Sequence, residues 1–265
     1  MSKTASPPGV MSDPHMVIPI RPGMLTGTDA TFHGNSQAET CRRCGVRQFG
    51  LFGVLDDDAL AEIHTHIADL RLSAGETLFS AQASGKALYT VKSGVVRIER
   101  SSEAGERRIL RLAGRADVIG LEAALDQTYA ADAVACTDVE VCRMPRVLID
   151  DLTHKHPELM HDLMKRWQRT LDDADEWLTE ITRGPARHRM LRLLLKLSEY
   201  SVGDSLVWWP TRLEMGAMLD MTFETASRLV SILRREGIVE PIDLRHARVN
   251  MSALLPALRA ESARA

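Results

Sequence analysis

TRLEMGAMLDMTFETASRLVSILRREG, residues 211–237, is the stretch that decides the fold of the carboxy-terminal part of the chain. Its spacing predicts two short helices joined by a tight turn. Thr211 and Glu214 form a capping box at the start of the first helix, in which each side chain satisfies a backbone N–H of the other residue. Thr222 offers a hydroxyl that caps the second helix, and Gly237 provides the left-handed residue that ends it. The stretch therefore predicts a helix-turn-helix.

The second predicted helix has one apolar and one polar face. Its apolar positions recur at the helical period and predict a buried stripe. They are Ala226, Leu229, Val230 and Leu233. Glu224, Ser227 and Arg228 share the other side at the amino end, where a helix in the major groove of DNA carries the side chains that reach base edges. This pattern favours DNA reading; the alternative is an ordinary helical hairpin with a solvated face.

Length and composition indicate a soluble globular protein with two domains. The 265 residues are 45% hydrophobic and 26% charged, with a formal net charge of −3. The sequence has no run of eighteen apolar residues, so we expect no membrane segment. The amino terminus lacks the basic-then-apolar pattern of a signal peptide, and we expect a cytoplasmic protein. In that reducing compartment the four cysteines favour metal binding or redox sensing over structural disulfides.

Residues 71–144 have a different character. Short apolar segments such as ALYTV, VVRIE and RILRL alternate with glycine-containing turns, which is typical of a β-sandwich, barrel or jelly roll. Before this block, the pattern from Asp56 to Leu70 predicts a helix because its apolar residues share one face. Residues 1–40 show no sustained periodicity and predict a disordered tail.

A long helix is predicted from Pro157 to about Arg183, and Gly184-Pro185 ends it. Its apolar residues are spaced three or four apart, which is typical of a helix that pairs with a second copy of itself. They are Leu163, Trp167, Leu171, Ala174, Leu178 and Ile181. We expect these six to form a dimer interface; the alternative is that they pack on the β segments of their own chain. Beyond Gly237, the segments IVEP and ARVNM predict a small β hairpin, and a short helix follows from Met251.

This order of elements resembles the CRP/FNR family, the bacterial transcription factors related to the cyclic-AMP receptor protein and the fumarate-nitrate reductase regulator. The most specific motif is Glu224-Thr225-Ala226-Ser227-Arg228, which is similar to the recognition-helix signature of the oxygen-responsive FNR branch. Three further segments resemble landmarks of the family's β-roll. They are Gly75-Glu76-Thr77-Leu78-Phe79, Leu88-Tyr89 and Ser93-Gly94.

The resemblance implies an α+β fold. It consists of an amino-terminal β-roll of the cyclic-nucleotide-binding jelly-roll type, a long dimerisation helix and a carboxy-terminal winged helix-turn-helix. The implied domains are a disordered tail at 1–40, a sensory β-roll domain with a cysteine-bearing amino-terminal segment at 41–156, the dimerisation helix at 157–184 and the DNA-binding domain at 185–265.

The resemblance also implies partners and residue roles. Such proteins bind double-stranded DNA as homodimers at palindromes of the TTGAT-N4-ATCAA kind, and they contact RNA polymerase. Glu224 would accept a hydrogen bond from cytosine, Ser227 would lie against thymine, and Arg228 would donate two hydrogen bonds to guanine. Phosphate contacts position the protein without specifying sequence. The candidates for them are Thr211, Arg212, Thr222, Arg234 and Arg235.

Nucleotide-binding members of the family hold the cyclic phosphate with an arginine and a serine. The matching stretch, GLEAALDQTYAADAVAC, has Ala130 and Ala131 at those places. Because no cation is then available for the phosphate, we expect that cyclic AMP is not the effector.

The oxygen-responsive branch holds a [4Fe-4S] cluster with three amino-terminal cysteines and one from the β-roll. Cys41 and Cys44 match the first pair and Cys142 matches the distant ligand, whereas Gly50 or Phe52 stands where the third cysteine would be. Cys136 precedes Cys142 by six residues and could approach it on a neighbouring strand. The resulting set has the right number of ligands for a cubane cluster or for zinc. It comprises Cys41, Cys44, Cys136 and Cys142.

Two other interpretations of the cysteines stay open. Cys41 and Cys44 lie among arginines, which favour the thiolate, and could be a plain redox pair. Cys136 and Cys142 have apolar neighbours and could be small core residues of a regulator without a cofactor.

Two other function classes are disfavoured. A cupin-like enzyme needs two or three histidines on its strands, and residues 71–144 contain none. A phosphate-binding loop, an HExxH pattern and a nucleophile elbow are also absent from the sequence. A protein-binding adaptor would present an exposed apolar anchor, whereas the predicted recognition face is polar.

Overall fold

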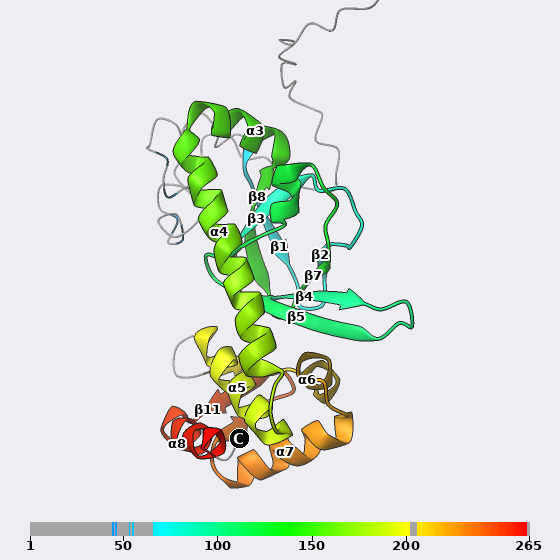
Figure 1. Cartoon of the computed structure of the whole chain (residues 1–265), viewed down its shortest axis with the longest axis vertical. Helices are drawn as coiled ribbons and strands as arrows, with labels where there is room; N and C mark the ends of the chain where they lie inside the picture. Colours follow the sequence, from blue (N-terminus) through cyan, green and yellow to red (C-terminus); the bar gives the residue numbers. More distant parts are fainter. Residues whose placement is uncertain are drawn as a thin grey trace, which may run out of the picture. The chain divides into compact units, whose positions relative to one another are not determined.

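The computed structural model describes residues 66–201 and 206–263, together with Cys44, Val46, Gly53 and Leu55. Within these residues the amino-terminal half is a β-domain of two four-stranded antiparallel sheets (Figure 1). The first sheet has the order β1-β8-β3-β6 and the second the order β2-β7-β4-β5. The strands are β1 (Ala68–Leu72), β2 (Thr77–Phe79), β3 (Ala87–Ser93), β4 (Val96–Ser101), β5 (Arg107–Ala113), β6 (Val118–Ile119), β7 (Asp132–Ala135) and β8 (Val139–Pro145). The predicted β-roll is therefore confirmed.

A glycine forms the corner at which the chain passes from the first sheet to the second. Gly94 lies between β3 and β4 with φ at 84°, a conformation that L side chains rarely adopt. A Cβ atom there would meet the carbonyl oxygen of Asp138 at 2.3 Å. The corner consequently requires glycine for both its backbone conformation and its close approach to the start of β8.

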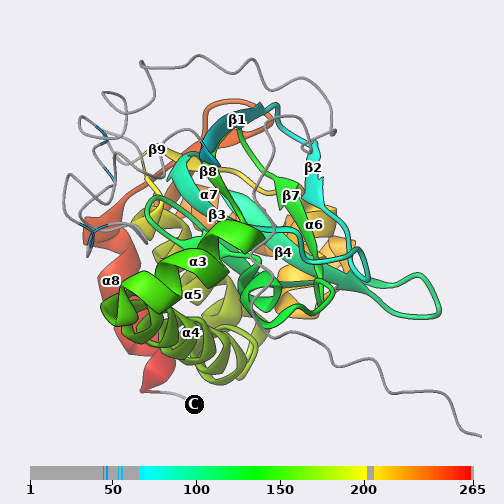
Figure 2. The same ribbon diagram turned by 90° about the horizontal axis from the view of Figure 1, so that it is seen from above.

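A short helix interrupts the β-domain, and further helices follow it, including one that starts at Pro157 as predicted. They are the short η3 (Leu121–Leu125) between β6 and β7, then α3 (Arg146–Lys155), α4 (Pro157–Glu176) and η4 (Trp177–Ile181). Seen from above, α3 and α4 lie together along one side of the strands (Figure 2). Proline at the first helical position suits the start of α4, since its missing N–H has no partner there anyway. The turn η4 is π-helical, and the Thr182 N–H donates to the Trp177 carbonyl at 3.1 Å.

The carboxy-terminal part is helical with a small three-stranded sheet, β10-β11-β9. Its elements are α5 (Ala186–Glu199), β9 (Leu206–Trp208), α6 (Arg212–Leu219), α7 (Phe223–Arg235), β10 (Val239–Pro241), β11 (His246–Val249) and α8 (Met251–Ser262). Helices α6 and α7 are the predicted pair, and β10 and β11 form the predicted hairpin. This arrangement is consistent with a winged helix-turn-helix, so the predicted fold class is confirmed.

One predicted helix is wrong at its carboxy-terminal end. Residues 56–65 lie outside the described part of the chain, but Ala68–Leu72 is the edge strand β1, paired antiparallel with β8. The apolar spacing of Ile67 and Leu70 fits a helix, yet Leu70 pairs with Val141 across the sheet. Pairing with a distant strand has overridden the local pattern. The predicted tail, 1–40, also lies outside the described residues.

The described residues form two hydrophobic cores. The first lies between the β sheets and includes Leu159 and Leu163 of α4. The second joins α5, α6, α7 and the small sheet, and it also contains Val95, Ile109 and Leu112 from the β-domain. The β4–β5 region consequently packs against the helix-turn-helix. In the described part of the chain, no helix is both long and apolar enough to cross a membrane.

Candidate nucleic-acid interface

Helix α7 holds its polar face outward by burying the opposite face. Ala226, Leu229, Val230 and Leu233 are its buried residues. The Thr222 Oγ1 accepts a hydrogen bond from the Thr225 N–H at 3.3 Å and caps the amino end. Glu224 and Arg228 are exposed and Ser227 is half-buried, so the structure brings these three predicted residues together on one accessible face.

The position of Glu224 at the start of the helix favours its ionised form. Its own backbone N–H and the Thr222 hydroxyl hydrogen-bond the carboxylate, and these bonds lower the pKa of Glu224. An ionised carboxylate at the exposed amino end can accept hydrogen bonds but cannot donate them. At the other end, Arg234 and Arg235 are exposed, and Gly237 ends the helix with φ at 68°.

Helix α6 begins with the predicted capping box. The Thr211 N–H donates to Glu214 Oε2 at 2.7 Å, and the Glu214 N–H donates to Thr211 Oγ1 at 3.2 Å. Arg212 follows, half-buried, with its guanidinium 5.4 Å from the centre of the Trp209 ring. Burial lowers the pKa of Arg212, which nonetheless stays charged at neutral pH because arginine titrates so high.

Side chains from α5 and β5 hold the turn between α6 and α7. Asp220 has a left-handed backbone with φ at 54°. Arg189 of α5 donates to the carbonyl oxygens of Leu219 and Asp220, the latter at 3.1 Å. Arg108 of β5 pairs with the Asp220 carboxylate at 2.9 Å. These contacts hold the angle between the two helices.

Sequence reasoning missed Phe223, the first residue of α7. Its side chain is 50% exposed and lies immediately before Glu224. Phe223 precedes Ala226 by three residues and Val230 by seven, so it lies on the side of the helix that carries the buried stripe. It is exposed because it stands at the end of the helix. Only the structure reveals an aromatic side chain beside the predicted base-reading residues.

The exposed apolar residues along α4 and η4 are not the same six residues that the sequence predicts for a dimer interface. The two sets differ at both ends. Leu171 and Leu178 are 51% and 62% exposed, and Trp167 and Ala174 are partly exposed. Leu163 and Ile181 are only 4% and 2% exposed because they pack into the first and second core. Met160 and Met164 are exposed instead.

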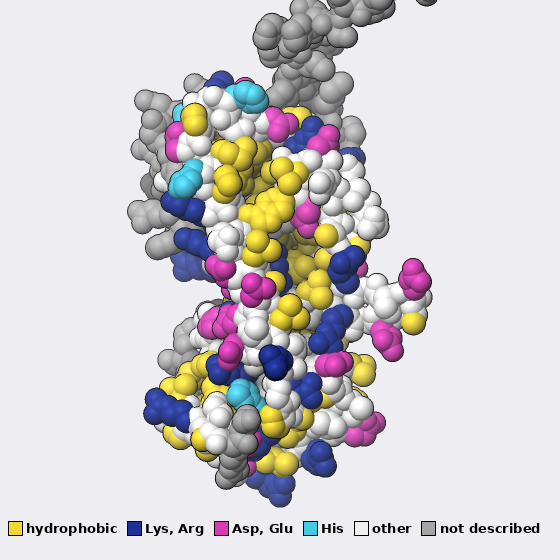
Figure 3. Space-filling view, viewed as in Figure 1, with side chains coloured by type: hydrophobic (Ala, Val, Ile, Leu, Met, Phe, Trp, Pro, Cys, Tyr) yellow, Lys and Arg dark blue, Asp and Glu magenta, His cyan; other side chains and the backbone are white. Residues whose placement is uncertain are grey.

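We call the exposed set the α4 seam. It consists of Met160, Met164, Trp167, Leu171, Ala174 and Leu178. Its spacing alternates strictly between four and three, which is the heptad pattern of a coiled coil. Figure 3 shows apolar side chains gathered over and beside α4 on this face.

Aromatic rings fill the interior of the β-domain beside the stretch that corresponds to the nucleotide-binding cassette. Tyr129 is buried and stacks on Phe79, with 4.0 Å between ring centres, and Phe79 stacks on Tyr89 at 5.7 Å. The Tyr129 hydroxyl donates to the Ala87 carbonyl oxygen at 2.7 Å. Ala130 and Ala131 follow directly and offer no cation for a phosphate.

The structure separates Cys136 from Cys142. Cys136 follows β7 and is buried in the second core at 1% exposure, whereas Cys142 lies on β8 and packs against the first core. The expected approach on neighbouring strands is wrong because β7 pairs with β2 and β4, and β8 pairs with β1 and β3. Burial raises the pKa of Cys136 to about 12, although Arg97 nearby acts to lower it. A thiol of this kind does not fit a metal-bound thiolate.

The four-cysteine site therefore does not fit the structure. Cys41 lies outside the described residues, and Cys44 is half-buried. Without Cys136 the sequence retains three cysteines, one fewer than a four-thiolate cluster needs. Among the residues that the structure describes, no group of three or more His, Cys, Asp or Glu side chains could hold a metal ion.

Comparison with known proteins agrees with this geometry. The family model of the cyclic nucleotide-binding domain matches residues 69–156. The transcriptional activator protein FnrL of Cereibacter sphaeroides is 29% identical over 225 residues, which cover 81% of this chain and 90% of that protein. An anaerobic regulatory protein of Pasteurella multocida is 26% identical over 205 residues, 75% of each chain.

A solved structure shows the same fold. FixK2 from Bradyrhizobium japonicum matches with a TM-score of 0.65 at 22% identity, over 72% of this chain and 96% of that one. The β-domain, the long helix and the helix-turn-helix with its small sheet thus recur in the order found here. The chain belongs to the CRP/FNR family of DNA-binding transcriptional regulators, and it is a regulator and not an enzyme.

Proposed function

We propose that this regulator binds palindromic double-stranded DNA of the TTGAT-N4-ATCAA kind as a homodimer, with one half-site read by each α7. The observation that carries the proposal is the exposed group of Glu224, Ser227 and Arg228 at the capped amino end of that helix. Arg228 suits guanine, which offers two acceptors, and ionised Glu224 suits the amino group of cytosine. A mobility-shift titration tests this: the palindrome should bind far more tightly than a duplex with both half-sites scrambled, and equal affinities would contradict it.

Phosphate contacts would come from the residues that surround this face. Thr211 and Thr222 stand at the amino ends of α6 and α7, where backbone N–H groups also favour an anion. Arg234 and Arg235 are exposed at the far end of α7. The guanidinium of Arg212 lies over the Trp209 ring, which orients this cationic candidate. We propose RNA polymerase as a further partner of the DNA-bound dimer. We also propose that the protein acts in the cytoplasm.

The α4 seam supports the dimer. Four large apolar side chains on one narrow stripe are left exposed by the chain itself, and a second copy of the helix would cover them. A dimer also explains the palindrome, because two-fold symmetric proteins read inverted half-sites about one helical turn apart.

Phe223 should make the affinity for DNA depend on the methyl group of a thymine in the half-site. An exposed phenyl ring beside the base-reading residues is a suitable contact for that methyl. Replacing the contacted thymine with deoxyuridine removes the methyl group alone. Wild-type binding should then weaken about fourfold, which corresponds to the loss of about 0.8 kcal/mol from one buried methyl group. Phe223→Ala should bind both duplexes equally, whereas Phe223→Leu should retain part of the difference. Equal wild-type affinity after substitution of every thymine in turn would contradict this role.

We further propose that the protein responds to oxygen or redox state without a four-cysteine [4Fe-4S] cluster. The anaerobic regulatory protein among the relatives supports the signal, and the burial of Cys136 argues against the cluster. Cys41 and Cys44 are the remaining candidates for a thiol switch. Protein purified under anaerobic conditions should be colourless and contain no stoichiometric iron or sulfide, and Cys136→Ala should show the same composition. Iron and sulfide in cubane proportions that disappear in Cys136→Ala would contradict the proposal.

A further inference from the structure

Helix α6 is attached to the β-domain at both of its ends. At its amino end, Arg97 Nη1 of β4 donates to Glu214 Oε1 at 3.4 Å. At its carboxy end, Arg108 Nη1 of β5 pairs with Asp220 Oδ1 at 2.9 Å. Between these points, apolar side chains of the β4–β5 region and of α6 share the second core. The contact consequently covers the whole length of a helix that belongs to the DNA-reading unit.

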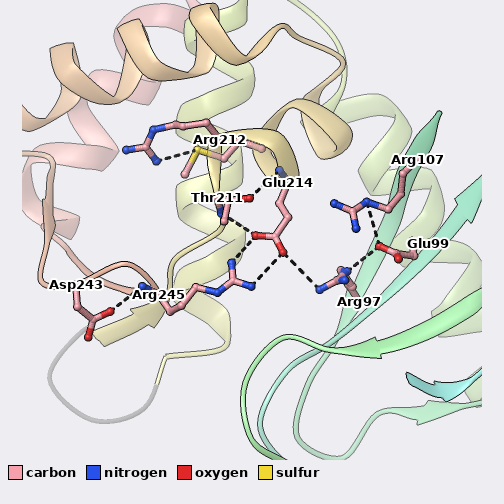
Figure 4. A network of polar contacts seen from close by, with 9 residues as sticks. Arg97, Glu99, Arg107, Thr211, Arg212, Glu214, Asp243 and Arg245 are labelled. Carbon is pink, nitrogen blue, oxygen red and sulfur yellow. Dashed lines mark hydrogen bonds and ion pairs between the residues drawn. The ribbon is translucent and has the colours of Figure 1, made fainter. Parts of the chain in front are cut away.

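The amino-terminal attachment is a buried network of charges, shown in Figure 4. Arg97, Glu99 and Glu214 are all buried. Arg97 Nε donates to Glu99 Oε2 at 2.7 Å, so one guanidinium joins a carboxylate of its own strand to the carboxylate of α6. Buried charges are costly unless they are paired. Arg97 also pairs with Glu99, and Glu214 also pairs with Arg245, so the Arg97–Glu214 contact links two charge pairs across the boundary between β4 and α6.

Glu214 joins the attachment to the rest of the reading unit. Its carboxylate accepts from Arg245 Nη1 in the loop before β11 at 2.6 Å and from the Thr211 N–H at 2.7 Å. Burial alone would raise the pKa of Glu214, but the bonds from Arg245 and Thr211 outweigh burial and lower it. The side chain is therefore ionised at neutral pH and can pair with Arg97.

We propose that Arg97 is a positioning residue for DNA reading: it fixes α6, and through the short turn at Asp220 also α7, to the β4–β5 region of the sensory domain. This inference depends on the proposed reading of half-sites by α7. Arg97 is buried and so cannot itself contact DNA, while the predicted reading face of α7 is exposed with the network intact. The attachment thus orients the reading helix and leaves it accessible.

The physical consequence is pre-organisation. A dimer must present both α7 helices at the separation of the two half-sites. Reading units that are already fixed lose little conformational freedom on binding, whereas loosened units must be ordered by the DNA. Loss of the attachment should therefore weaken DNA binding on the order of tenfold, within the usual range of coupling between sites. Base preference should stay the same, because the atoms that read bases are unchanged.

Arg97→Gln is the direct test, with Arg100→Gln as its matched control on an exposed position of the same strand. Dissociation constants are measured for the palindrome and for half-site variants at several salt concentrations. Arg97→Gln should weaken binding to every duplex by a similar factor, with an unchanged slope of log affinity against log salt. Arg234→Gln, at a proposed phosphate contact, should instead reduce that slope by about 0.9 per half-site. Arg97→Lys keeps the charge but lacks the planar fork, so it should show an intermediate loss.

Several outcomes would overturn the inference. One is a folded, dimeric Arg97→Gln protein with wild-type affinity; another is a reduced salt slope, which would make Arg97 a phosphate contact. If Arg97→Gln does not fold, Arg108→Gln at the other end of α6 is informative because that pair is partly exposed. Arg108→Gln should weaken binding in the same uniform way, and wild-type affinity would refute the attachment. Failure of the wild-type protein to prefer the palindrome would instead refute the proposed function.

Discussion

Replacing both Leu171 and Leu178 with aspartate should give a folded monomer whose affinity for the palindrome is lower by roughly 100- to 10,000-fold, because linked half-site binding is lost. Both leucines are exposed in the carboxy-terminal half of the α4 seam, so the chain's own cores do not need them. In a dimer each would lose about 1.5–3 kcal/mol of apolar burial, and the new carboxylates would face each other across the two-fold axis. Sedimentation velocity and DNA titration on the same samples measure both effects.

The control for this prediction lies on the same helix. Lys165 is exposed on the side of α4 away from the seam, so Lys165→Asp should leave the protein dimeric and bound to DNA. Thermal unfolding of all variants should show intact cores, since neither leucine is buried. A double aspartate variant that stays dimeric at micromolar concentration would show that the interface lies elsewhere.

Arg228→Ala should abolish the preference for one guanine in each half-site. The guanidinium is exposed on the first turns of α7 and can donate two parallel hydrogen bonds to a guanine edge. Such a pair contributes roughly 1–3 kcal/mol of discrimination against other bases, or about 5- to 150-fold per half-site. Titrations against duplexes that vary the half-site one base pair at a time measure the preference directly.

The comparison with Arg235→Ala separates reading from positioning. Arg235 lies at the far end of α7, where we propose a phosphate contact, so its loss should weaken binding to all duplexes alike. Arg228→Ala should remove the dependence of affinity on the base at one position of the half-site and leave the dependence at the other positions unchanged. If its profile matched the wild-type profile, Arg228 would not contact a base and the proposed placement of α7 would be wrong.

The helix-turn-helix could be predicted well from the sequence because its signals are local. The capping box of Thr211 and Glu214, the cap at Thr222 and the stop at Gly237 each act within four residues of the helix end that they define. The α4 seam was predicted less well. Apolar residues line two faces of that helix, and spacing alone did not show that Leu163 and Ile181 face the cores while Met160 and Met164 face outward.

Features that depend on distant contacts could not be predicted. Cys136 and Cys142 are six residues apart, yet the chain crosses from one sheet to the other between them. Arg97 and Glu214 are separated by 117 residues, and no local pattern marks either as a partner of the other. Phe223 was assigned to no role because periodicity does not distinguish a helix end from its middle.

The π-helical turn at Trp177–Ile181 has a geometric consequence for the dimer that we propose. A π turn accommodates one residue more than an α turn, and one extra residue shifts the residues that follow it in the same helix by about 100° about the helix axis. Trp177 and Ile181 point into the second core while Leu178 stays in line with the seam. The end of this helix consequently serves two surfaces at once, the core of its own chain and the exposed stripe that we propose for the dimer.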